Sequence, residues 1–95
     1  HKFLVCEPLL ERIDLSVLRE EMRGIEGVTV GGESGDAARV CDYDWVLAIR
    51  DFCATEGIGF SFHQTGARFL KNGKEYRIPK KWQRSQAKRA EIDLL

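Results

Sequence analysis

The stretch Val28–Arg39, VTVGGESGDAAR, decides the fold of this chain. A short apolar run with β-branched residues ends in two glycines, and Glu33 follows them directly. Buried strands of parallel sheets have this composition, and ligands bind at the carboxyl ends of such strands. Glycines also allow another group to approach the backbone closely. The stretch therefore predicts a buried parallel strand whose polar exit lies in a binding or catalytic mouth.

Two more segments read as buried strands, KFLVCEPL at residues 2–9 and IGFSFHQTG at residues 58–66. Helical patterns separate the three strands, DLSVLREEMRG at residues 14–24 and DYDWVLAIRDFCATEG at residues 42–57. Strands that alternate with helices at this spacing predict parallel pairing through right-handed crossovers.

The ends of the two helices have capping signals. Asp14 or Ser16 is expected to cap the first helix, and Gly24 to close it. Asp42 or Asp44 is expected to cap the second, which Gly57 ends.

The last third of the chain departs from this alternation. Asn72-Gly73 lies between two short strand-like arms in RFLKNGKEYRI, residues 68–78, and predicts a β-hairpin. Pro79 ends the second arm, and KKWQRSQAKRAEIDLL, residues 80–95, reads as a basic helix or tail. No linker composition interrupts the chain. We therefore expect one α/β domain with a βαβαβ core at residues 1–66, a hairpin at 67–79 and the basic segment at 80–95.

Composition limits the class of protein. The chain has 95 residues, 43% hydrophobic and 32% charged, which is typical of a soluble globular domain. No apolar run is long enough to span a membrane, so no membrane partner is expected. The three cysteines form no C-x-x-C pair, which favours a reducing, cytoplasmic location. The chain lacks an initiating methionine, and we interpret it as a fragment of a longer protein.

Charge is segregated along the chain. Residues 1–65 contain six Lys/Arg and twelve Asp/Glu, a net charge of −6, whereas residues 66–90 contain nine Lys/Arg and one Glu, a net charge of +8. The basic third is expected either to face a polyanion such as nucleic acid or to neutralise the acidic part of the same chain.

Polar residues follow all three predicted strands at the same geometric level. Glu7, Glu33 and His63 are the candidate catalytic residues, because carboxylates and a histidine can act as acids, bases or hydrogen-bond partners near neutral pH. The candidate substrate-binding residues beside them are Gly31, Gly32, Ser34 and Gln64. The alternatives are a Glu7 carboxylate held by Arg12 or Arg39, a tight turn that needs the glycines, and a structural histidine.

The hairpin begins at the carboxyl end of the third strand and therefore lies at the same mouth. Its candidate substrate-binding residues are Arg68, Lys71, Lys74, Arg77, Lys81 and Trp82. Cations with interleaved aromatic rings are what nucleic acid or phosphate recognition requires. A solvated hairpin with ordinary surface lysines is the alternative. No ligand spacing joins Cys6, Cys41 and His63, so no metal site is predicted.

The segments FLVCEPLLERIDL and VTVGGESGDAARVCDYDWVLAIRDFCATEGIGFSFHQTG resemble an uncharacterised family of bacteriophage-type proteins. Members of that family are similar to radical S-adenosylmethionine enzymes, with a βα barrel and an N-terminal cysteine cluster that holds an iron–sulfur centre. The resemblance covers nearly the whole chain. It implies a partial TIM-like barrel of three βα units, with the N-terminal barrel of the parent protein as partner.

The chain departs from the family pattern in two places. It lacks the cysteine cluster, so the resemblance implies an iron–sulfur cluster and S-adenosylmethionine only for the full-length protein. Many relatives end the third strand in Lys-Gln-Trp-Gly, where this chain has His63-Gln64-Thr65-Gly66. A role for that lysine therefore does not carry over.

Two hypotheses about function follow. In the first, the chain is the substrate-facing part of a radical-S-adenosylmethionine-like barrel protein that acts on an anionic or nucleic-acid substrate. In the second, it is a non-catalytic module whose basic hairpin and tail bind nucleic acid or a protein. Open sheet edges of a barrel fragment also predict self-association.

Overall fold

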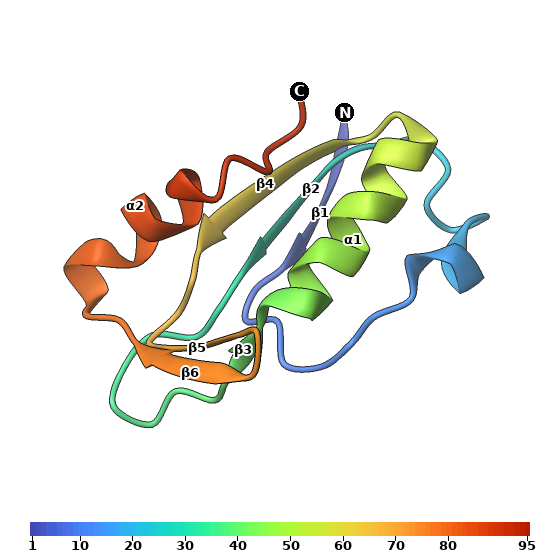
Figure 1. Cartoon of the computed structure of the whole chain (residues 1–95). Helices are drawn as coiled ribbons and strands as arrows, with labels where there is room; N and C mark the ends of the chain where they lie inside the picture. The colour runs from blue at the N-terminus through green and yellow to red at the C-terminus, as the bar shows by residue number, and fades with distance from the viewer.

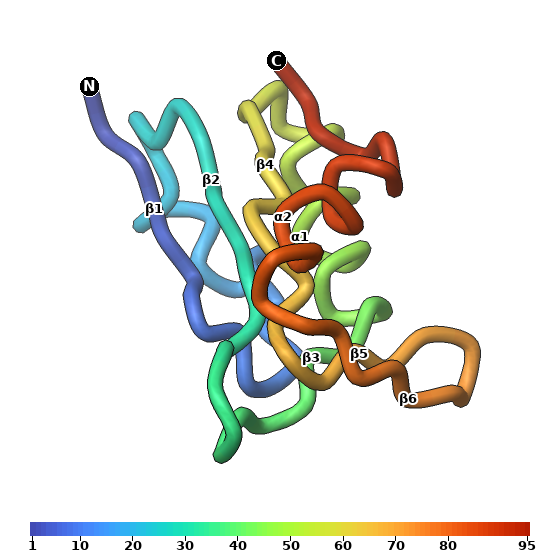
Figure 2. Tube along the Cα trace, turned by 90° about the vertical axis from the view of Figure 1, so that its left-hand side faces the viewer, coloured from blue at the N-terminus to red at the C-terminus, as the bar shows by residue number.

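Three strands form the central sheet of the computed structural model, which describes all residues from 1 to 95 (Figure 1). They are β1 (Lys2–Cys6), β2 (Ile25–Gly31) and β4 (Gly59–Gln64), and they run parallel in the order β1-β2-β4. Figure 2 shows the three strands side by side. The strands predicted from the apolar segments and their parallel pairing are confirmed.

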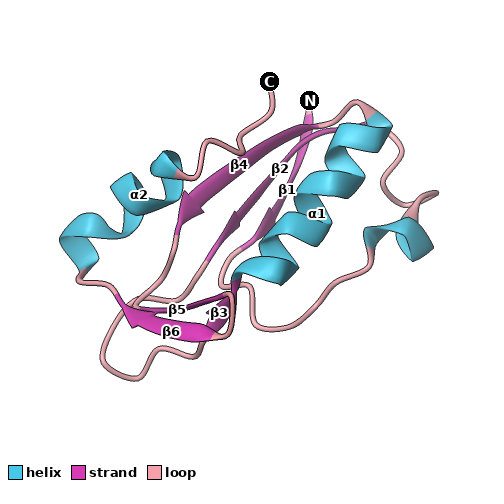
Figure 3. Ribbon diagram, viewed as in Figure 1, coloured by secondary structure: helices cyan, strands magenta, loops and turns pink.

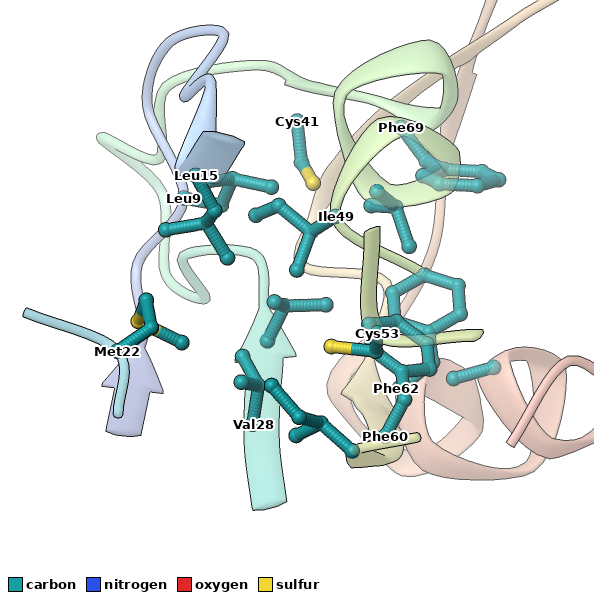
Figure 4. Close-up of a cluster of buried hydrophobic side chains, with 14 residues drawn as sticks. Leu9, Leu15, Met22, Val28, Cys41, Ile49, Cys53, Phe60, Phe62 and Phe69 are labelled. Atoms are coloured by element: carbon teal, nitrogen blue, oxygen red, sulfur yellow. The ribbon is translucent and has the colours of Figure 1, made fainter. Parts of the chain in front are cut away.

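One face of the central sheet packs against helix α1 (Tyr43–Glu56), because alternate residues of a strand face opposite sides. The register places Cys6, Val30 and Phe62 in one row on this face. Their neighbours from α1 are Val46, Ile49 and Cys53, all with 0% exposure. All of these except the half-buried Cys6, which packs against them, belong to a core cluster of 14 buried apolar residues (Figure 4).

The opposite face of the central sheet, called the open face below, carries Phe3, Val5, Thr29 and Ser61. The register places Val5, Thr29 and Ser61 in one row. Phe3 and Val5 are 68% and 64% exposed, so no part of the chain covers this face over β1.

Helix α1 has the ends that its sequence predicts. The Asp42 side chain accepts a hydrogen bond from the backbone N–H of Asp44 at 2.8 Å, which confirms Asp42 as the cap. Gly57 ends the helix with a φ of 70°, and its N–H donates to the carbonyl of Cys53. A left-handed residue at this position favours glycine.

The prediction of a helix at residues 14–24 is wrong. Only a 3₁₀ turn, η1 (Leu15–Leu18), forms there, and turns follow it to Gly24. Asp14 does cap η1, by accepting a hydrogen bond from the N–H of Ser16 at 3.0 Å. Leu15 and Met22 are buried but Leu18 is 41% exposed, so the segment lacks the continuous apolar stripe that would hold a helix against the core.

A second sheet lies at the carboxyl end of the central strands (Figure 3). Its strands are β3 (Cys41–Asp42), β5 (Arg68–Lys71) and β6 (Lys74–Arg77). The β5–β6 hairpin is confirmed, with Asn72 and Gly73 at φ values of 53° and 76° in its turn. The parallel pairing of β3 with β5 was not predicted, because two residues are too few to leave a periodic signal.

The basic segment forms helix α2 (Lys80–Arg89), and the residues after it return along β4. Phe60 and Leu94 exchange two backbone hydrogen bonds, of 2.9 and 2.8 Å. The Asp93 carboxylate accepts a further bond from the N–H of Phe62 at 2.8 Å. The outer edge of β4 is therefore covered, contrary to the expectation of open edges, whereas the outer edge of β1 has no partner strand. Self-association stays a prediction.

The structure is thus a mixed α/β domain with two sheets and two helices, and no barrel closes. Neither helix combines the length and the hydropathy needed to cross a bilayer.

Candidate functional site

Glu7 and His63 meet at the carboxyl end of the open face. Both positions continue the period of two that places Val5 and Ser61 on this face, so both side chains point the same way. The Nδ1 atom of His63 lies 3.0 Å from Oε1 and 3.2 Å from Oε2 of Glu7. The structure therefore brings together two of the three candidate catalytic residues.

Arg84 joins this pair from helix α2. Its NH2 group lies 3.1 Å from Nε2 of His63. One turn further along the helix, Lys88 donates to the Ser61 hydroxyl at 3.2 Å and lies 2.7 Å from a carboxylate oxygen of Asp93. Arg84 and Lys88 therefore place two cations along the part of the open face that belongs to β4.

The groups that approach Gly31 and Gly32 most closely belong to the chain itself. A Cβ on Gly31 would lie 2.7 Å from the carboxyl carbon of Glu7. A Cβ on Gly32 would overlap the carbonyl of Thr65, at 2.8 Å from its carbon, and would lie 2.9 Å from the Cα of Gly66. The glycines allow the exits of β2 and β4, and the Glu7 side chain, to pack against one another.

Glu33, the third candidate catalytic residue, is bound to Arg39 rather than to the Glu7–His63 pair. Its carboxylate accepts hydrogen bonds from the backbone N–H, Nε and NH2 of Arg39 at 2.9, 3.1 and 3.0 Å. The side-chain hydrogen bond from Arg39 is the largest cause of a Glu33 pKa lowered to about 2. Glu33 is therefore ionised near neutral pH and closes its own loop.

The other predicted residues near this edge have separate places. Gln64 donates from Nε2 to the carbonyl of Gly32 at 2.9 Å, so it also holds the exits of β2 and β4 together. Ser34 is exposed on the loop beyond Glu33.

A groove runs between the β5–β6 hairpin and α2, with a volume of about 990 Å³; we call it the hairpin groove. Its aromatic lining residues are Tyr43, Phe62, Phe69, Tyr76 and Trp82. Its cationic lining residues are Lys71, Arg77 and Arg89. None of its lining residues is an Asp or a Glu. The groove therefore combines flat apolar surfaces with positive charge.

The predicted basic residues of the hairpin differ in their partners. Arg68 is paired with Glu75, with contacts of 3.1 and 2.9 Å, and its hydrogen bond lowers the pKa of the Glu75 carboxyl. Lys71 lies over the Tyr43 ring, 5.3 Å from its centroid. Lys74 and Lys81 lie over Tyr76 and Trp82 in the same manner, outside the groove lining. Arg77 approaches Glu75 only to 4.0 Å.

Comparison with protein families gives one match: a family described as "Protein of unknown function (DUF5131)" matches residues 1–93. The chain belongs to the DUF5131 family. No curated protein and no solved structure matches the chain significantly.

The cysteines of this DUF5131 protein are free and dispersed in or beside the core. Burial raises the pKa of the Cys41 thiol to about 12 and of the Cys53 thiol to about 11, and it also raises that of Cys6. Neutral thiols are poor nucleophiles and poor metal ligands.

Residues 1–95 do not supply the ligands of an iron–sulfur cluster, which the resemblance implies only for the full-length protein. No group of three His, Cys, Asp or Glu side chains is placed to hold a metal ion, so these residues do not fit an iron–sulfur cluster.

The sequence did not predict which side chains helix α2 of this DUF5131 protein buries and which it places beside the strands. Gln83 and Ala87 are both 1% exposed, and they form the buried stripe of a helix that is otherwise polar. Arg84 and Lys88 lie on one side of that stripe, while Trp82 and Arg89 lie on the other. The spacing of Gln83 and Ala87 was the available signal, but it does not say which surface the helix covers.

Proposed function

We propose that this chain binds single-stranded nucleic acid in the hairpin groove. The observation that supports the proposal is a groove of about 990 Å³ with aromatic walls, three cations and no carboxylate. Single-stranded nucleic acids bind where bases stack on aromatic rings and cations track the phosphates. Trp82 and Tyr76 are 51% and 42% exposed, so each has a ring surface available for stacking. The net charge of +8 over residues 66–90 attracts the same ligand.

Two families of variants test the electrostatic and the stacking parts of this proposal separately. Log affinity falls as log salt rises, with a slope of about −0.7 for each phosphate contact to a single strand. Changing Lys71, Arg77 and Arg89 together to Gln should therefore make this slope less steep by about 2. Trp82→Ala should weaken binding by about 5- to 100-fold, the effect of losing one stacked base, and should leave that slope unchanged. Anisotropy of a labelled oligonucleotide across salt measures both effects.

The matched control is Arg23→Gln, which removes a cation that is paired with Glu20 and does not line the groove. It should change neither affinity nor slope. Polyglutamate serves as a second probe, because it carries charge without bases. Binding of polyglutamate as tight as that of the oligonucleotide, or an unchanged slope in the triple variant, would contradict the proposal. If polyglutamate binds tightly and Trp82→Ala leaves its affinity unchanged, the partner is an acidic protein instead.

A second candidate function is supported by the open face. The open face carries the exposed Phe3 and Val5 and the half-buried Thr29 and Ser61, and Glu7, His63 and Arg84 lie at its carboxyl end. Barrel enzymes carry their active sites at this end of parallel strands. In this proposal the chain is part of a longer TIM-like barrel, whose remaining strands cover the open face. The ligands of an iron–sulfur cluster would then come from outside residues 1–95.

The full-length protein, purified without oxygen, distinguishes this candidate. Bound iron together with cleavage of S-adenosylmethionine would support it. A full-length protein without iron that still binds oligonucleotides would leave nucleic-acid binding as the function of the chain.

A further inference from the structure

We propose that Glu7, His63 and Arg84 form a binding site for a tetrahedral oxyanion of the phosphate class, and that His63 takes up one proton from solvent when the anion binds. This site does not depend on the hairpin groove, because the two lie on different sides of the buried stripe of α2.

The hydrogen bonds assign the proton of His63. A guanidinium group only donates hydrogen bonds, so the 3.1 Å contact with Arg84 requires a lone pair on Nε2 of His63. The ring proton is then on Nδ1, where it donates to the Glu7 carboxylate at 3.0 Å. His63 is therefore a neutral imidazole in this arrangement, with both ring nitrogens engaged.

Protonation of His63 is incompatible with the Arg84 contact. A proton on Nε2 would place two donors, both positively charged, against each other. An oxyanion removes this conflict, because one of its oxygens can accept from Nε2–H while another accepts from the guanidinium. Glu7 continues to accept from Nδ1–H and stabilises the imidazolium.

The charges around His63 determine how the site responds to pH. Glu7 comes from the exit of β1, Arg84 and Lys88 from α2, and Asp93 from the segment that follows α2. Strand β2 adds no charge here, because its residue beside the Glu7 carboxyl group is Gly31. Arg84 and the imidazolium provide the two donors to the anion, and Asp93 neutralises much of the charge of Lys88.

Sulfate is the probe, because its charge does not change near neutral pH whereas that of phosphate does. Binding is followed by NMR through the ring signals of His63. His1 is the only other histidine, so loss of one signal in His63→Gln gives the assignment. Affinity should rise as the pH falls from about 8 toward neutrality, by at most about tenfold for each pH unit, which is the limit for uptake of one proton.

Variants identify the donors. His63→Gln should remove the pH dependence of sulfate binding. Arg84→Gln should lower the affinity for sulfate at least about tenfold, since charged hydrogen bonds contribute roughly 1.5–3 kcal/mol. Arg23→Gln is the control and should bind sulfate as the parent does. A sulfate affinity independent of pH, or a pH dependence that persists in His63→Gln, would overturn the proposal.

Inorganic phosphate and a nucleoside 5′-monophosphate identify the source of the anion. Tighter binding of the ester, abolished by Arg84→Gln, assigns the site to the phosphate end of a larger ligand. Tighter binding of inorganic phosphate assigns it to the free ion. Since His63→Gln leaves the hairpin groove intact, failure of the oxyanion site would leave oligonucleotide binding unaffected.

Discussion

Replacing Gly32 with alanine is expected to destabilise the fold by about 3 kcal/mol or more, at the upper end of the range for overpacking. A Cβ at this position would overlap the Thr65 carbonyl and lie 2.9 Å from the Cα of Gly66, and both are backbone groups that cannot rotate away. Relief of the clash requires that the exits of β2 and β4 separate. That movement would break the 3.0 Å hydrogen bond from the N–H of Gly32 to the carbonyl of Gln64.

Gly73→Ala is the matched control for this prediction. Gly73 has a φ of 76°, and no atom lies within 4 Å of the place that a Cβ would take, so only the left-handed backbone is penalised, by roughly 1–2 kcal/mol. Urea unfolding followed by circular dichroism measures both variants. Equal losses in the two variants would show that the contact between the exits of β2 and β4 does not constrain the fold.

Local patterns predicted the parts of the fold that local interactions determine. The apolar runs became parallel strands, Asp42 and Gly57 became the ends of α1, and Asn72-Gly73 became the hairpin turn. Each of these signals acts within a few residues of the chain. The prediction of a helix at residues 14–24 failed because an amphipathic helix needs a surface to pack against, and the core buries only two side chains of this segment.

Only the alternation of side chains along the strands made part of the site predictable from the sequence. That alternation placed Glu7 and His63 at one edge, where the structure brings them within hydrogen-bond distance. It did not indicate that Glu33 turns to Arg39, because a loop after a strand has no period. Nor did it indicate Arg84, whose place depends on how α2 docks on β4, a tertiary contact that no local pattern encodes.

Phe62→Ala is the second substitution with a large expected effect, a loss of about 3–5 kcal/mol of unfolding free energy. Phe62 is 0% exposed, and its ring centroid lies 6.2 Å from that of Tyr43 and 5.9 Å from that of Phe69. Truncation would leave a cavity between α1, β4 and β5 that these rings cannot fill without moving. Because Phe62 packs beneath Tyr43 and Phe69, which line the hairpin groove, movement of these two rings should also weaken oligonucleotide binding by the variant even where it remains folded.

Phe3→Ala removes the same side chain from the open face and is the control. Phe3 is 68% exposed, so its loss should change stability by about 0.5 kcal/mol or less in a monomer. Urea unfolding at several protein concentrations separates the two cases. If Phe3→Ala costs as much as Phe62→Ala, and the cost grows with protein concentration, then a second copy covers the open face and Phe3 is a buried residue of that assembly. A small cost that is independent of concentration would instead exclude self-association through this face, and would leave Phe3 and Val5 available to the further strands of the longer barrel proposed as the second candidate function.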